Sequence, residues 1–132
     1  MEEVLKFLQA NPVFYAATLD GDKPRVRPLG FFMQHENRLY FTVGKQKESY
    51  RQLRANPNIE ISTANTKKQW IRISGKVVFD DRPETALKVL ETMPSLKNIY
   101  NEQTGYVLAP FYLIDATAEF ADMNGGFKKV DL

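Results

Sequence analysis

Cationic side chains gather in two short stretches of the sequence. Arg25 and Arg27 alternate in "PRVRPLGFF" (residues 24–32), so a strand there would place both on one face. Further cations and hydroxyls follow, namely Thr42, Lys45, Lys47, Ser49, Arg51 and Arg54. Cations, hydroxyls and the backbone N–H groups at a helix start are the groups that bind a phosphate. The spacing therefore predicts an anion site, and a solvated basic rim is the alternative interpretation.

A hairpin and a helix would have to bring these residues together. We predict a strand over 24–34, a turn over 35–38 and a strand over 39–43, paired as an antiparallel hairpin. In such a pair, the end of the second strand lies beside the start of the first. A helix over 47–55 would then begin at the same end of the sheet as Arg25 and Arg27.

The rest of the chain predicts more strands, with helices inserted between them. Strands are expected at 13–19, 58–64, 69–79, 106–123 and in the terminal segment 125–132, and helices at 2–10 and 82–93. One face of the long strand is expected to carry Tyr112, Ile114, Ala116, Ala118 and Phe120, and the apolar stripe of the later helix Ala86, Leu87, Leu90 and Met93. With 132 residues, 43% of them hydrophobic, a single domain (1–132) is expected. Its class is α+β, mainly β: five or six antiparallel strands curled into a barrel, which removes exposed edges.

The only tryptophan of the chain lies in the predicted strand over 69–79. Alternation places Trp70 and Arg72 on the face opposite Ile71 and Ile73. An amphipathic cap over a strand end is one interpretation. The other is that this face meets a ring system or a partner subunit, where Trp and Arg are enriched.

Composition excludes several chemistries. The chain has one histidine, His35 in a predicted turn, and no cysteine, so we expect no metal site and no Cys–His pair. No phosphate-binding Walker loop or dinucleotide glycine fingerprint is present. A reaction, if there is one, would need a bound cofactor to supply the reactive atoms. The formal net charge of +2 is too small to argue for nucleic acid. The first residues lack the pattern of a signal peptide, and we expect a cytoplasmic protein with no membrane partner.

Three stretches in order carry a family resemblance. "RVRPLGFF", "LYFTVGKQKESYRQLRANPNIEIS" and "QWIRISGKVVF" resemble the pyridoxamine 5'-phosphate oxidase-related split-barrel family, which binds FMN. The match covers roughly residues 12 to 80. The resemblance implies a six-stranded antiparallel split barrel and a homodimer with FMN in the groove between its subunits.

The resemblance also implies roles for particular residues. Arg25, Val26, Arg27 and Pro28 would run beside the flavin ring, with Arg27 reaching toward the phosphate, while Thr42, Lys47 and Ser49 would hold the phosphate and Trp70 and Arg72 would approach from the other subunit. The terminal Arg-x-x-Pro-x-x-Trp-type segment that the oxidase uses on its substrate is not found in residues 122–132. We therefore expect a small FMN-dependent oxidoreductase of unknown substrate and not a vitamin B6 oxidase. The alternatives are a split barrel that binds a deazaflavin or haem, and a non-enzymatic barrel that binds single-stranded nucleic acid.

Overall fold

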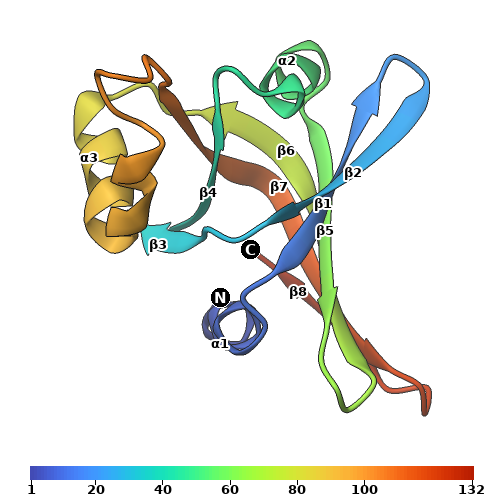
Figure 1. The fold of residues 1–132 in the computed structure, drawn as a ribbon. Helices are drawn as coiled ribbons and strands as arrows, with labels where there is room; N and C mark the ends of the chain where they lie inside the picture. The colour runs from blue at the N-terminus through green and yellow to red at the C-terminus, as the bar shows by residue number, and fades with distance from the viewer.

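A computed structural model describes residues 1–132 as one antiparallel sheet with helical segments around it (Figure 1). The strands are β1 (Phe14–Asp20), β2 (Lys23–Leu29), β3 (Met33–His35), β4 (Arg38–Gly44), β5 (Asn58–Ala64), β6 (Gln69–Phe79), β7 (Leu108–Asp122) and β8 (Phe127–Asp131). The helices are α1 (Glu2–Ala10), α2 (Glu48–Ala55), α3 (Pro83–Thr92) and the short 3₁₀ helix η1 (Pro94–Asn98). The strand order is β2-β1-β5-β6-β7-β4-β3, with β8 beside β7.

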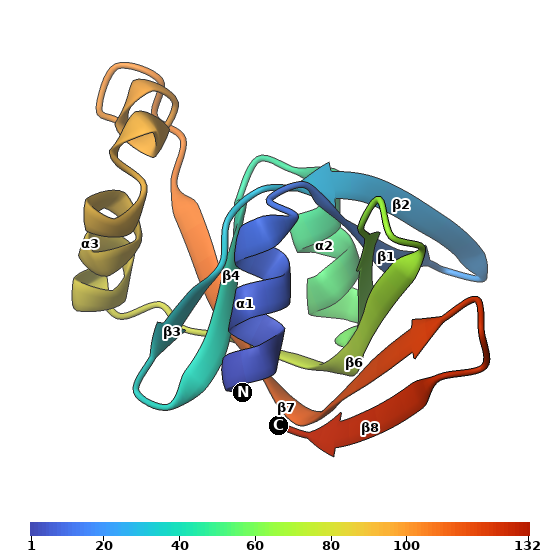
Figure 2. The ribbon, with the colours of Figure 1, turned by 90° about the horizontal axis from the view of Figure 1, so that it is seen from below.

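The sheet curls into a split barrel, as expected from the sequence, although it has eight strands where six were predicted. Helix α1 lies across one end of the barrel and α2 lies at the opposite end (Figures 1 and 2). Helix α2 packs against both β1 and β4, which are not neighbours in the sheet. The helix therefore bridges the open side of the barrel.

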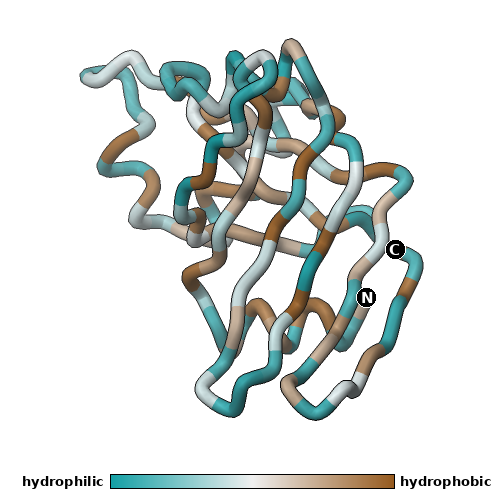
Figure 3. Tube along the Cα trace, turned by 90° about the vertical axis from the view of Figure 1, so that its right-hand side faces the viewer, coloured by the Kyte–Doolittle hydropathy of each residue, from teal (hydrophilic) through white to brown (hydrophobic).

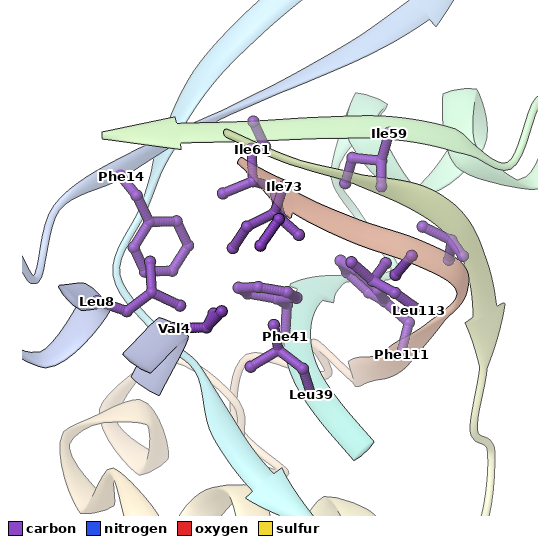
Figure 4. Packing of buried hydrophobic residues seen from close by; sticks show 14 of the residues in the cluster. Val4, Leu8, Phe14, Leu39, Phe41, Ile59, Ile61, Ile73, Phe111 and Leu113 are labelled. Carbon is purple, nitrogen blue, oxygen red and sulfur yellow. The ribbon is translucent and has the colours of Figure 1, made fainter. Parts of the chain in front are cut away.

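Aromatic and aliphatic side chains fill the space that the sheet encloses (Figure 4). The ring centroids of Phe14 and Phe41 are 5.5 Å apart, and Val4 and Leu8 of α1 close this core from one end. Along the strands, hydrophobic and hydrophilic residues alternate, as the sequence predicts (Figure 3). A second, smaller cluster lies beneath α3 and consists of Phe31, Met33, Tyr40, Val89 and Leu108.

The predicted strand over 24–34 is two strands, and the predicted hairpin is wrong. Strand β2 ends at Leu29 and pairs only with β1, whereas β3 begins at Met33 and pairs with β4. Pro24 and Pro28 lack the N–H that a second neighbour would need, so β2 is an edge strand. The chain then leaves that edge and crosses to the far edge of the sheet. Strand β2 therefore never pairs with β4.

The predicted face of the long strand is also wrong, because a bulge divides β7. Ala116 and Ala118 are buried, but Ile114 is 42% exposed. Asp115 has a φ of +49°, and the β6–β7 register shifts opposite Gly75. One extra residue on one strand reverses which side chains face inward. Tyr112 and Ile114 therefore lie on the face opposite Ala116.

Helix α3 buries a different face from the apolar one that the sequence predicted. Leu87 is 61% exposed, whereas Thr85 and Val89 are fully buried. Thr85 Oγ1 donates to the buried Asp80 carboxylate (2.8 Å), and Val89 packs in the cluster with Met33. A polar contact that the apolar pattern does not reveal therefore sets which side of α3 faces the barrel.

Candidate functional site

Helix α2 is the element around which the candidate site is built. Ser49, Gln52 and Leu53 are its buried residues, at the i, i+3, i+4 spacing of one helix face. Leu53 joins the main core, and Tyr50 packs its ring on Phe79 with centroids 5.0 Å apart. These contacts fix the helix against the barrel, where it bridges the gap between β1 and β4.

Arg27 is bound to this helix from the neighbouring edge strand. Its cross-strand partner is Ala16, whose side chain faces the barrel interior, so Arg27 also faces inward. Arg27 Nη1 donates to Thr18 Oγ1 (2.6 Å) and Nη2 donates to Gln52 Oε1 (2.7 Å). Burial, and then repulsion from Arg25, lower the pKa of Arg27 from its ordinary value. The guanidinium is thus half-buried beside α2 with only neutral partners.

Arg25 lies next along the same face and belongs to an exposed chain of ion pairs. Its Nε is 3.8 Å from a carboxylate oxygen of Asp20, and Arg51 Nη2 is 3.2 Å from the other oxygen. Arg51 also pairs with Glu48 (2.6 Å). Hydrogen bonds from Arg51 to Glu48 and then Asp20 raise the pKa of Arg51. Two carboxylates therefore balance two arginines here, which leaves the charge of Arg27 uncompensated.

The start of α2 offers donors that the chain itself does not use. Lys47 is the N-cap residue, its side chain is exposed, and it forms neither an ion pair nor a capping hydrogen bond. Ser49 is only 7% exposed, and its hydroxyl makes no hydrogen bond within the chain. No fully buried polar side-chain atom lacks a partner, so this hydroxyl reaches the surface. A helix of 1.5 Å rise per residue places Lys47 about 8 Å from Gln52 along the axis. Lys47 and Ser49 therefore lie at the start of α2, and Arg27 of β2 contacts Gln52 further along the same helix.

Two hydrogen bonds hold the loop that connects β4 to α2. The backbone N–H of Lys45 donates to the carbonyl of Val107 (2.9 Å), and Gln46 Nε2 donates to the hydroxyl of Tyr100 (3.3 Å). Thr42 precedes this loop on β4, where it pairs with Pro110, and its hydroxyl donates to the carbonyl of Val43 (3.2 Å). The loop between β4 and α2 is thus supported by the segment that follows η1.

Two of the predicted site residues do not join this group within one chain. Trp70 and Arg72 lie at the beginning of β6, beside the β5–β6 turn, and this turn is at the end of the barrel away from α2 (Figure 1). Trp70 lines an open pocket of about 810 Å³ between α1, this turn and the β7–β8 hairpin, with Phe7, Phe120 and Phe127 among its walls. This pocket is therefore not at the cationic group.

Val26 and Pro28 lie on the outer side of β2, away from Arg27. Their cross-strand partners are Ala17 and Tyr15, and the Val26 side chain is 66% exposed. Leu19 and Tyr15 of β1 are 36% and 50% exposed on the same face. The β1–β2 hairpin thus has an apolar outer face, defined by Tyr15, Leu19, Val26 and Pro28, and a cationic inner face.

The donors at α2 suit the phosphate end of FMN. A phosphate dianion takes charged N–H donors, hydroxyls and the free N–H groups of a helix start. Lys47 and Ser49 provide an unpaired cation and an unpartnered hydroxyl, and Arg27 has further N–H groups without partners. The donor set of the chain therefore fits this group. The described residues contain no cluster of metal-ligating side chains.

The sequence pattern of the pyridoxamine 5'-phosphate oxidase family matches residues 1–121, and the chain belongs to this family. Among solved structures, a NimC/NimA family protein from Clostridium acetobutylicum is 39% identical, with a TM-score of 0.91 over 100% of this chain and 92% of that one. General Stress Protein 26 from Bacillus anthracis is 18% identical, with a TM-score of 0.73 over 98% of this chain and 97% of that one.

A haem-binding protein from Mycobacterium smegmatis is 14% identical, with a TM-score of 0.68 over 91% of this chain and 52% of that one. The identities to it and to the stress protein show a shared fold and no more. No curated protein matches the sequence. None of the helices has the length and apolar character needed to cross a membrane.

Sequence reasoning missed Thr18 and Gln52, which hold Arg27. Both are 3% exposed. A signal for each was present. Thr18 continues the buried alternation of Phe14 and Ala16 on β1, and Gln52 lies next to Leu53 on the buried face of α2. A polar residue at an apolar position indicates a buried hydrogen bond, because an unpaired polar group there is costly.

Proposed function

We propose that this chain is an FMN-binding oxidoreductase that acts as a homodimer on a small-molecule substrate. The observation that carries the proposal is the unpaired Lys47 at the uncapped start of α2, on the helix that also holds the uncompensated Arg27. Membership of the pyridoxamine 5'-phosphate oxidase family, which commonly binds flavin, supports the same conclusion.

In this proposal, Lys47, Ser49 and Arg27 bind the phosphate of FMN, and Thr42 on β4 adds a hydroxyl. The ring lies beside residues 25–28 of β2, with Arg25, which shares the face of Arg27, near its edge. An apolar wall suits the ring, and a nearby cation favours its reduced, anionic form. When bound, FMN supplies the electron transfer, while the side chains of this chain hold and orient it.

A second copy of the chain completes the proposed site. The apolar outer face of the β1–β2 hairpin (Tyr15, Leu19, Val26 and Pro28) is the kind of surface that a partner subunit covers. Trp70 and Arg72 lie far from α2 within one chain, so they would reach the flavin only from the partner. Trp and Arg are frequent at the centre of such interfaces.

An absorption spectrum of the purified protein tests the proposal, followed by mass spectrometry of whatever heat releases. We expect the bands of oxidised flavin and the mass of FMN. Titration of the apoprotein with FMN, a deazaflavin and haem separates the alternatives, and a homopolymer titration at two salt concentrations tests single-stranded nucleic acid. The proposal fails if the apoprotein does not bind added FMN, and binding of haem, the deazaflavin or the homopolymer would then favour the corresponding alternative.

A further inference from the structure

We propose that Thr18 and Gln52 are positioning residues, which hold the Arg27 guanidinium so that one of its edges stays free for the phosphate of FMN. The inference rests on the proposed function and adds two residues to that site. Neither side chain can contact a large ligand directly, because each is only 3% exposed. Any role in binding must therefore act through Arg27.

The three side chains form a closed triangle of hydrogen bonds. Thr18 Oγ1 donates to Gln52 Oε1 (2.6 Å), and the same oxygen of Gln52 accepts from Arg27 Nη2 (2.7 Å). Arg27 Nη1 donates to Thr18 Oγ1 (2.6 Å) and lies 3.4 Å from the carbonyl oxygen of Ala16, which it also reaches. Each member contacts the other two, so no one of them can rotate without breaking two bonds.

This triangle uses only part of the guanidinium. Arg carries five N–H groups in a planar fork. Both N–H groups of Nη1 and one of Nη2 in Arg27 have partners within the chain. The Nε–H group and the second Nη2–H group are left, and they lie along one edge of the fork. Two parallel N–H groups on one edge match two oxygens of a phosphate.

The anchors are neutral, which preserves the charge of Arg27. Arg25 and Arg51 both lie near the carboxylate of Asp20 (3.8 and 3.2 Å), whereas Arg27 has no carboxylate within ion-pair distance. A glutamate at position 52 would fix the guanidinium equally well but would cancel its charge. A hydroxyl and an amide fix it and leave the positive charge for a bound anion.

The test compares FMN with riboflavin, which lacks the phosphate, by quenching of flavin fluorescence. We expect Thr18→Val to weaken FMN binding about tenfold and to leave riboflavin binding within about twofold of wild type. Thr18→Ser keeps the hydroxyl and should restore FMN binding. Thr63→Val is the matched control, because Thr63 is also a buried threonine whose hydroxyl donates within the chain (to the carbonyl of Val13, 3.0 Å).

Gln52→Glu separates positioning from simple structural support. The new carboxylate forms an ion pair with Arg27, so the melting temperature should not fall, yet FMN binding should weaken at least tenfold. In an Arg27→Gln background, Thr18→Val should cause no further loss of FMN affinity, because its effect acts through the arginine.

The outcomes distinguish failure of the positioning role from failure of the proposed function. If wild type binds FMN and Arg27→Gln weakens it, but Thr18→Val and Gln52→Glu bind like wild type, the positioning role is overturned and the proposed function stands. Additive losses in the double variant overturn the positioning role in the same way. A wild-type protein that binds neither FMN nor riboflavin overturns both.

Discussion

The hydroxyl of Tyr40 donates to the carboxylate of Asp80 across 2.8 Å, and this bond joins β4 to the start of α3. Tyr40 is fully buried and the carboxylate is nearly so. Burial, and then the hydrogen bond to Asp80, raise the pKa of the Tyr40 phenol to about 12. A phenol that remains protonated is the donor that a buried carboxylate needs.

Both carboxylate oxygens of Asp80 accept hydrogen bonds. Arg82 Nε and Nη2 donate to its two oxygens (2.9 and 2.8 Å), and Thr85 Oγ1 donates at 2.8 Å. The hydrogen bond from Arg82 is the first cause that holds the pKa of Asp80 well below its usual range. Arg82 also reaches Glu36 (2.8 Å), so this group of residues ties α3 to the β3–β4 turn.

Asp80→Asn should destabilise the fold by about 2–4 kcal/mol, because it removes the buried charge that Arg82 pairs with. The folded pKa of Asp80 is lowered, so its contribution is complete above the unfolded pKa of about 3.9 and is lost as the pH falls further. Urea unfolding at pH 7 and at pH 3 measures this. The gap between wild type and variant should be smaller at pH 3.

The matched control for this change is Asp81→Asn. Asp81 is exposed and pairs only loosely with Lys45 (3.9 Å), so its loss should change stability by less than about 0.5 kcal/mol. Equal losses for the two variants, or a gap that does not depend on pH, would contradict the assignment of a buried, ionised Asp80.

Gly75 lies where β7 bulges, and a larger residue there should strain the sheet. A Cβ added to Gly75 would lie 3.0 Å from the Cβ of Ala116 and 3.1 Å from the carbonyl oxygen of Ile114. Gly75→Ala should therefore cost about 1–3 kcal/mol in urea unfolding. Gly30→Ala is the control, since its nearest neighbour would be the carbonyl oxygen of Pro12 at 3.8 Å. A Gly75→Ala variant as stable as Gly30→Ala would show that the strands can separate there without cost.

Alternation along the sequence predicted which side chains of a short strand share a face, and ordered motifs predicted the family. Alternation placed Arg25 and Arg27 on one face, and their cross-strand partners Thr18 and Ala16 are both buried, as this requires. The same alternation failed after Leu113, because the bulge at Asp115 depends on Gly75 of another strand. Periodicity within one strand carries no information about an irregularity that two strands share.

The sequence predicted that Arg25 and Arg27 lie near the cations that follow β4, but it predicted the wrong contact between the elements that carry them. We expected a hairpin between 24–34 and 39–43, but the element that joins the two groups is α2, through Gln52 and Arg27. Strand pairing across long sequence separations depends on the whole topology, which short-range turn signals do not determine. The place of Trp70 beside a flavin depends on a second chain and stays a prediction, as do the FMN-binding residues themselves.

Val26→Asp should weaken the proposed dimer by at least tenfold without unfolding the chain. The side chain is 66% exposed, so the fold does not depend on it, but a carboxylate buried at an apolar interface lacks water. Sedimentation equilibrium measures the dissociation constant, and FMN affinity should fall with it. Leu87→Asp is the control, because Leu87 is equally exposed (61%) but lies on α3. A wild-type chain that is monomeric at every concentration would refute the dimer.

Lys47→Ala should weaken FMN binding at least tenfold, which corresponds to a lost charged hydrogen bond of roughly 1.5 kcal/mol or more. Riboflavin binding should change little, because the lost contact is to the phosphate, and the effect should shrink at high salt. Lys88→Ala removes the same charge from the exposed face of α3 and should leave both ligands unaffected. Equal effects of the two lysine changes would mean that Lys47 acts only through net charge. Selective loss with Lys47→Ala would locate the phosphate at the start of α2, where the chain itself leaves the N–H groups and the ammonium without partners.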